Sequence, residues 1–293
     1  MHYVGRAAAH VLEPPPAYAA FSHLYRQHVL VGAFAGAVHT HLTLNDLAPG
    51  GHIAPHMHAA EEGFYVLDGR AVVGVGEHAF ELRAGDFGAL KYGTVHTWRN
   101  IGSAPLRWFQ ISMPQPKPEG AERDTWVVRA GRAPSEGRRL EAGPLPEGVL
   151  LAHFDVGQIP PPGEARAGLA TLPGVFLKWL VDESFGARHH RMLMIEYQPG
   201  VSIPLHDHTF EEGYFILSGV VHAELDGKKY KLGPGDVVWT GVGCVHAFAN
   251  AGNEPVRWLE TFAPQPPAEN VFRFMHEWMQ KGDTLERGTQ GAA

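Results

Sequence analysis

Short stretches of alternating hydrophobic and polar residues, separated by turns rich in glycine and proline, recur along the chain. Residues 40–44 alternate in this way, and residues 63–69 are rich in aromatic and β-branched side chains and end at a turn glycine. A period of two is typical of strands with one buried face. The pattern therefore predicts an all-β protein built from short strands.

Turn residues place several of these strands in hairpins. Two hairpins are predicted, residues 71–75 with 79–82 and residues 221–225 with 230–232. The second is joined through Asp226 and Gly227, and this dipeptide is a strong signal for a two-residue hairpin loop. Pro49 and Gly50 predict a further turn, which would separate residues 40–44 from the next strand.

The two halves of the chain repeat each other. Residues 55–63 read Pro-His-Met-His-Ala-Ala-Glu-Glu-Gly, and residues 205–213 read Leu-His-Asp-His-Thr-Phe-Glu-Glu-Gly, 150 positions later. About a third of the aligned positions are identical between residues 50–116 and residues 200–266. This level of identity indicates a duplicated unit, so the halves should have the same fold.

The repeat sets the expected domain organisation, because 293 residues suffice for two cores of ordinary size. The predicted parts are an N-terminal lead-in (1–30), a first domain (31–116), a connector rich in proline and glycine (117–170), a second domain (171–268) and a C-terminal tail (269–293). The lead-in is expected to wrap the first domain or a neighbouring subunit. Residues 270–279 fit either a short amphipathic helix or an edge segment against the second domain.

Charge and composition limit the classes of partner that the protein can bind. The net charge is −7 and no run of Lys or Arg could follow a phosphate backbone, which argues against a nucleic-acid partner. No apolar run approaches the roughly 20 residues needed to span a bilayer, and the N-terminus has no signal-like apolar region. The single cysteine, Cys244, excludes an internal disulfide. We expect a cytoplasmic protein with a small-molecule partner and no membrane partner.

Histidines and a carboxylate in the repeated motif predict a metal site in each half. His56 and His58 are two positions apart, so on a strand both side chains lie on one face, and Glu62 follows on the same side. His96 is a third imidazole downstream. The second half repeats the set at His206, His208, Glu212 and His246. Three imidazoles and one carboxylate suit Mn, Fe, Ni, Co or Zn, with positions left open for water or substrate.

These motifs resemble those of the cupin superfamily over most of the chain. The matching residues are Gly51, His56, His58, Glu62, Gly69, Gly85, Gly93, His96 and Asn100 in the first half, and Gly219, Gly235, Gly243, His246 and Asn250 in the second. Lys91 and Gly241 stand where the family usually has proline, and the leading glycine of the second copy is shifted to Gly200. The resemblance to two-domain cupins implies two tandem double-stranded β-helix barrels of jelly-roll type, up to one metal per barrel, and a homodimer.

The resemblance leaves three functions open, since a fold does not determine a reaction. The first is an Fe(II)- or Mn(II)-dependent, dioxygenase-like oxidoreductase that acts on a small oxygen-rich or aromatic organic acid. The second is a non-redox hydrolase similar to ureidoglycine aminohydrolases. That family has a carboxylate first and a glutamine last among its ligands, whereas this chain has His206 and His246 there. The third is a metal-stabilised binding protein without turnover. No catalytic residue and no organic cofactor is assigned.

Several residues near the motifs admit two interpretations. Glu61 and Glu211 precede the carboxylate ligands and should face away from the metal, either in solvent or supporting a ligand. Cys244 is either a packed side chain or a nucleophile. The basic residues 188–191 either clamp a substrate carboxylate or lie on a surface strand. The two metal sites need not share one role, and one could be catalytic while the other is structural.

Overall fold

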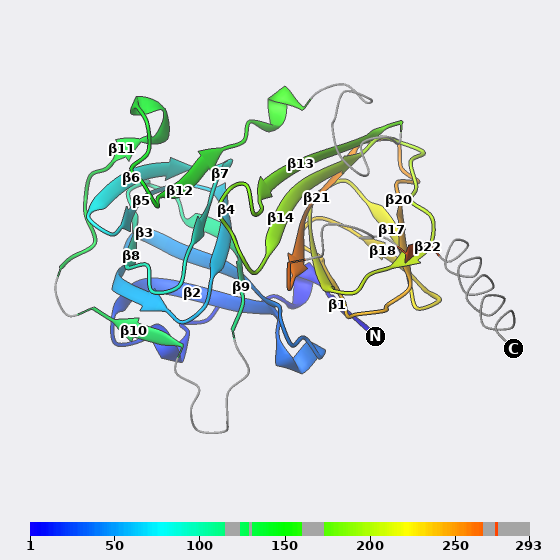
Figure 1. Ribbon diagram of the computed structural model, residues 1–293, viewed down its shortest axis with the longest axis horizontal. Coiled ribbons are helices and arrows are strands. Elements are labelled where there is room, and N and C mark those ends of the chain that lie inside the picture. Colours follow the sequence, from blue (N-terminus) through cyan, green and yellow to red (C-terminus); the bar gives the residue numbers. More distant parts are fainter. Residues whose placement is uncertain (115–123, 129–130, 160–172, 266–272, 275–293) are drawn as a thin grey trace, which may run out of the picture.

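The fold is all-β, as predicted. The structure is a computed structural model that describes residues 1–114, 124–128, 131–159, 173–265 and 273–274, and it forms two barrels side by side (Figure 1). Within these residues the only helices are short 3₁₀ turns. They lie at Ala7–Ala9, Pro16–Tyr18, Ala33–Ala35, Leu140–Ala142 and Val156–Gln158.

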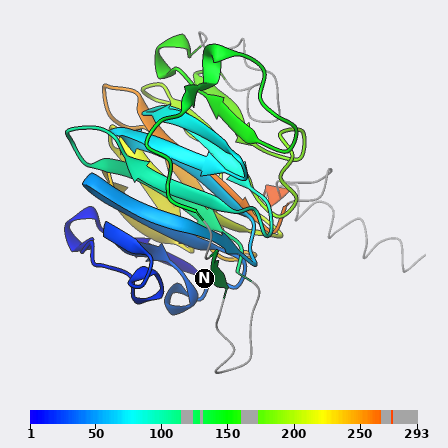
Figure 2. The same cartoon turned by 90° about the vertical axis from the view of Figure 1, so that its left-hand side faces the viewer.

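The first barrel is a curled sheet in the order β11-β6-β5-β8-β3-β9-β4-β7-β12, with β2 and β10 also paired to β3. Its strands are β2 (Ser22–Val31), β3 (His41–His58), β4 (Glu62–Asp68), β5 (Arg70–Val75), β6 (His78–Arg83), β7 (Asp86–Leu90), β8 (His96–Asn100), β9 (Leu106–Ser112), β10 (Thr125–Val127), β11 (Arg138–Arg139) and β12 (Leu150–His153). Figure 2 views the molecule from the side of this barrel, with the second barrel behind it.

The second barrel consists of two sheets, in the orders β1-β19-β16-β21-β14-β13 and β18-β17-β20-β15-β22. Its strands are β1 (His2–Gly5), β13 (Val175–Val181), β14 (Arg191–Tyr197), β15 (His206–Asp207), β16 (Glu211–Ser218), β17 (Val221–Leu225), β18 (Lys228–Leu232), β19 (Val237–Thr240), β20 (His246–Ala249), β21 (Val256–Ala263) and β22 (Arg273–Phe274). Both predicted hairpins are confirmed, as β5–β6 and β17–β18. Asp226 and Gly227 have φ of 47° and 77°, as a two-residue hairpin loop of the mirror-image type requires.

One predicted turn is wrong. Pro49 and Gly50 do not separate two strands, because β3 runs without a break from His41 to His58, and Gly50 only bends it with φ of 76°. The ladder continues because β2 pairs with β3 on both sides of the bend, Tyr25 with Leu47 and Ser22 with Ile53. In the second barrel the strand does end, since β14 stops at Tyr197, and this is why that barrel divides into two sheets.

One strand crosses between the barrels, which also share a hydrophobic contact. β1 precedes the first barrel in sequence but pairs with β19 of the second. Each barrel has its own core, and a third buried cluster lies between them, where the rings of Phe109 and Phe215 stack with centroids 5.3 Å apart. The two metal motifs are therefore held in one packed body. No helix among the described residues is long and apolar enough to cross a membrane.

Candidate metal centres

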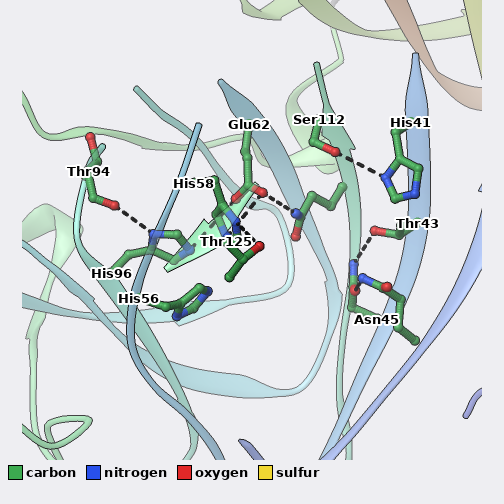
Figure 3. Close-up of polar contacts among 12 residues, drawn as sticks. His41, Thr43, Asn45, His56, His58, Glu62, Thr94, His96, Ser112 and Thr125 are labelled. Carbon is green, nitrogen blue, oxygen red and sulfur yellow. Dashed lines mark hydrogen bonds and ion pairs between the residues drawn. The ribbon is translucent and has the colours of Figure 1, made fainter. Parts of the chain in front are cut away.

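The first barrel brings the three predicted histidines together. His56 and His58 lie at the end of β3, and His96 begins β8, where it pairs directly with His56. Their ligand atoms all lie within 4.8 Å of one another, and all three side chains are buried. Figure 3 shows the rings facing a common point beside Glu62.

Glu62, the first residue of β4, completes the first set. Its two carboxylate oxygens lie 3.5 Å from His58 Nε2 and 3.8 Å from His96 Nε2. Gln110 of β9 donates a hydrogen bond of 3.0 Å from Nε2 to the carboxylate and holds its orientation. Such supporting contacts fix a ligand before the metal arrives.

The second barrel repeats this arrangement in a tighter form. His206 of β15 pairs with His246 of β20, and the ligand atoms of His206, His208 and His246 again lie within 4.8 Å of one another. The carboxylate of Glu212 lies 3.2 Å from His208 Nε2 and 3.1 Å from His246 Nε2. Tyr214 donates a hydrogen bond of 2.6 Å to this carboxylate.

Backbone carbonyls orient four of the imidazoles. Nδ1 of His56 lies 2.8 Å from the carbonyl oxygen of Ala54, and Nδ1 of His96 lies 3.0 Å from that of Thr94. The second barrel has the same contacts, from His206 to Pro204 at 2.7 Å and from His246 to Cys244 at 2.9 Å. A carbonyl only accepts, so Nδ1 carries the proton and the lone pair of Nε2 points to the centre of each site.

Burial favours neutral imidazoles and disfavours the ionised carboxylates. It lowers the pKa of His58, His96 and His246 to about 4 each, and that of His206 to about 3. Burial likewise raises the pKa of Glu62 to about 7, and that of the second-barrel carboxylate Glu212 to about 8. In each centre burial therefore disfavours both the protonated imidazoles and the ionised carboxylate, because their charges are poorly solvated.

This donor set fits a divalent metal ion. His58 Nε2 is buried and has no hydrogen-bond partner among the described residues, although it faces the other donors. A buried ring nitrogen without a partner costs free energy unless a cation or a hydrogen-bonding group meets it. Three neutral nitrogens and one carboxylate oxygen, with no thiolate, suit first-row transition metals with open positions.

Comparison with known proteins agrees with this geometry. The cupin domain model matches residues 43–112 and 193–262, one match in each barrel. The chain is a bicupin. No match was found among curated proteins.

Several solved bicupin-like structures share the fold at low sequence identity. The putative glyoxylate-induced protein from Pseudomonas aeruginosa has a TM-score of 0.64 and 19% identity, covering 89% of this chain and 87% of its own. Oxalate decarboxylase from Lactobacillus farciminis has a TM-score of 0.66 and 16% identity, covering 95% and 90%. Protein Ylba from E. coli has a TM-score of 0.62 and 15% identity, covering 92% and 93%. These similarities establish the fold of the bicupin and leave its reaction open.

A cavity of about 310 Å³ adjoins the first centre and contacts His58 and Glu62. Polar side chains and apolar surface both contribute to the rest of its wall. The other lining residues are Ala17, Tyr18, Gln27, His41, Thr43, Ala60, Gln110, Ser112, Pro114, Asp124 and Thr125. Sequence reasoning missed this wall because its residues come from separate segments, namely the lead-in, β2, the start of β3, β9 and β10, and none of these positions belongs to the histidine motifs.

Glu61 and Glu211 have a role that neither interpretation anticipated. Both side chains face away from the metal sites, as predicted, but they are buried and bind the opposite barrel. Glu61 accepts hydrogen bonds of 2.9 Å from the backbone nitrogens of Arg188 and His189. His190 is buried and its Nδ1 lies 2.8 Å from the same carboxylate. The basic segment therefore joins the barrels instead of facing a cavity.

Glu211 makes the reciprocal contact. It accepts hydrogen bonds of 2.8 Å and 3.1 Å from the backbone nitrogens of Val38 and His39 in the first barrel. Residues 38–39 and 188–189 occupy equivalent positions in the repeat. The carboxylate beside each metal ligand thus clasps the neighbouring barrel, and we call these two contacts the reciprocal clasps.

Cys244 is a packed side chain. It is 1% exposed, and burial together with the nearby charge of Asp226 raises the pKa of its thiol to about 12, so a nucleophilic role is disfavoured. Asp226 also bonds His2 Nδ1 at 3.0 Å, and this contact ties β1 to the second barrel. Trp98 and Phe248 pack in the barrel cores behind the metal sites.

Proposed function

We propose that this bicupin is a metal-dependent enzyme that acts on a small, oxygen-rich organic acid at the first centre. One observation carries the proposal: a cavity of about 310 Å³ opens directly onto His58 and Glu62. That volume is at the small end of the range for ligand sites. It suits a substrate of few heavy atoms.

The wall of the cavity offers an oxygen-rich substrate several hydrogen-bonding partners. Gln27, Gln110, Ser112 and Thr43 contribute amide and hydroxyl groups. His41 is partly buried, desolvation lowers the pKa of its imidazole, and Nδ1 lies 3.2 Å from Ser112 Oγ. Neutral donors and acceptors of this kind bind carbonyl, carboxylate and hydroxyl oxygens.

Tyr18 lines the cavity beside the centre and can offer a hydrogen bond there. Its ring lies 5.6 Å from that of His56 and 6.3 Å from that of His58, measured between centroids. Burial raises the pKa of its phenol, so the hydroxyl stays protonated at neutral pH. A bound Mn(II) or Fe(II) ion would supply Lewis-acid or electron-transfer chemistry in its open coordination positions. The chain's own contribution is to orient the substrate and to exclude water.

The reaction proposed first is dioxygenase-like. Oxalate decarboxylase, a structural relative, acts on a small oxygen-rich acid, and we extend to this bicupin that substrate class and not that reaction. The test is metal analysis of the purified protein, followed by oxygen consumption with a panel of small hydroxy, keto and dicarboxylic acids. Oxygen uptake that His56→Ala abolishes would support the proposal. Anaerobic ammonia release would instead indicate an aminohydrolase, and no turnover with tightly held metal would indicate a binding protein.

A further inference from the structure

The sequence repeat permits a position-by-position comparison of the space beside the two centres. In the first barrel Ala60 and Ser112 line the cavity. Their counterparts 150 positions later are Phe210 and Phe262. Two small side chains in one barrel thus correspond to two aromatic rings in the other.

These rings lie directly against the second centre. The ring of Phe210 stacks on that of His208 with centroids 4.7 Å apart, and it contacts the ring of Phe262 at 4.9 Å. Both phenylalanines are 2% exposed. Leu193, fully buried, replaces the cavity residue Thr43. Apolar side chains therefore stand at these three positions, whereas Gln110 corresponds to the buried Glu260.

The second carboxylate is also engaged more completely. Tyr214 replaces Phe64, and its hydroxyl lies 2.6 Å from the Glu212 carboxylate and 3.1 Å from His246 Nε2. At the first centre the equivalent ring has no hydroxyl, and the carboxylate is bonded by Gln110 at the edge of the cavity. Glu212 and His246 thus share a hydroxyl partner that the first centre lacks.

We propose that the two metal centres have different access: the first is open to water and substrate, and the second is sealed by Phe210 and Phe262. The second ion then has a structural role in its barrel, next to the clasp that Glu211 makes with the first barrel. This assignment deepens the proposed function by naming the reactive centre. It is tested without turnover, so the failure of one proposal can be told from the failure of the other.

The test uses Mn(II) as probe and measures how strongly the bound ion accelerates the relaxation of water protons. His56→Ala and His206→Ala each leave one intact centre, and bound manganese is counted by elemental analysis. Full-length His206→Ala should retain most of the relaxation enhancement of the wild type. His56→Ala should retain one ion but lose most of the enhancement. Equal enhancement from the two single-centre proteins would overturn the proposal.

Exchanging the sealing residue provides a matched pair of variants. Ala60→Phe should keep the metal content of the wild type but reduce its relaxation enhancement, because the new ring fills the open cavity. Phe210→Ala should increase the enhancement by exposing the second ion. If Phe210→Ala fails to fold, Ala60→Phe and the two single-centre proteins still test whether the two centres differ in access. An Ala60→Phe protein with full manganese and unchanged enhancement would contradict the assignment.

Discussion

Replacing Glu62 by glutamine should stabilise the metal-free protein at high pH, although it removes a metal ligand. Glu62 is 5% exposed, and burial raises its pKa from 4.5 to about 7. A carboxyl group with a raised pKa favours the folded state when protonated. Its contribution is complete below pH 4.5 and is lost as the pH rises through 7.

The magnitude follows from the two pKa values. A rise from 4.5 to about 7 corresponds to about 3 kcal/mol of stability lost by the wild type between these pH values. Glutamine has the same shape, can still accept the hydrogen bond from Gln110 and never ionises. The unfolding free energy of Glu62→Gln relative to the wild type should therefore increase by up to about 3 kcal/mol from pH 4.5 to pH 8.

The assay is urea unfolding of chelator-treated wild type and Glu62→Gln across this pH range, repeated with added Mn(II). Added Mn(II) should make the wild type the more stable of the two proteins, since the ion stabilises the wild type more than a variant with one ligand fewer. Glu61→Gln is the control at the neighbouring position, and its effect on stability should depend on pH in the opposite direction. Burial raises the pKa of Glu61, but hydrogen bonds from His190 and two backbone N–H groups outweigh it and lower the pKa. Its charge therefore stabilises above pH 4.5, so this variant should be destabilised at neutral pH and less so in acid.

A stability difference between wild type and Glu62→Gln that does not change with pH would refute the reasoning. It would mean that the carboxyl group is hydrated, or already paired with a cation, in the folded protein. An equal metal-induced stabilisation of both proteins would refute the assignment of Glu62 as a ligand.

Three further outcomes are expected. His206→Ala should lower the bound metal by one ion per chain in elemental analysis, because the first barrel keeps its own set of donors; an unchanged stoichiometry would exclude His206 as a ligand. Glu211→Gln should destabilise the protein by about 2 kcal/mol in urea unfolding, since the backbone N–H groups of Val38 and His39 lose a charged acceptor; no measurable loss would mean that the clasp is not needed. Cys244 should react with a thiol reagent only after unfolding, because it is 1% exposed; fast labelling of the native protein would contradict its burial.

The fold and the clustering of three histidines in each barrel were predictable because their signals are local and repeated, and metal binding by these residues stays a prediction. Alternation gave the strands, Asp226 and Gly227 gave a hairpin, and the spacing of His56 and His58 placed both rings on one face of a strand. The continuity of β3 through Pro49 was not predictable in this way. It depends on pairing with β2, a strand from the lead-in that carries no motif.

The reciprocal clasps show what one sequence cannot provide. Alternation correctly turned Glu61 and Glu211 away from the metal, but it could not tell whether water or another domain lay there. The answer depends on how the barrels pack. Only the structure shows that residues 188–190 of one barrel and residues 38–39 of the other meet these carboxylates.

The difference between the centres was present in the sequence but had no meaning before the fold was known. Ala60 and Phe210 lie between the histidine pair and the carboxylate in each copy, and the ligand spacing is the same around them. In the structure this position contacts the space beside the second histidine, so an alanine leaves a cavity and a phenylalanine fills it. Duplication therefore conserves the ligands through backbone register, whereas access to the metal depends on side-chain volume and can diverge by one substitution at a time. For this reason equal ligand sets do not imply equal chemistry in the two barrels.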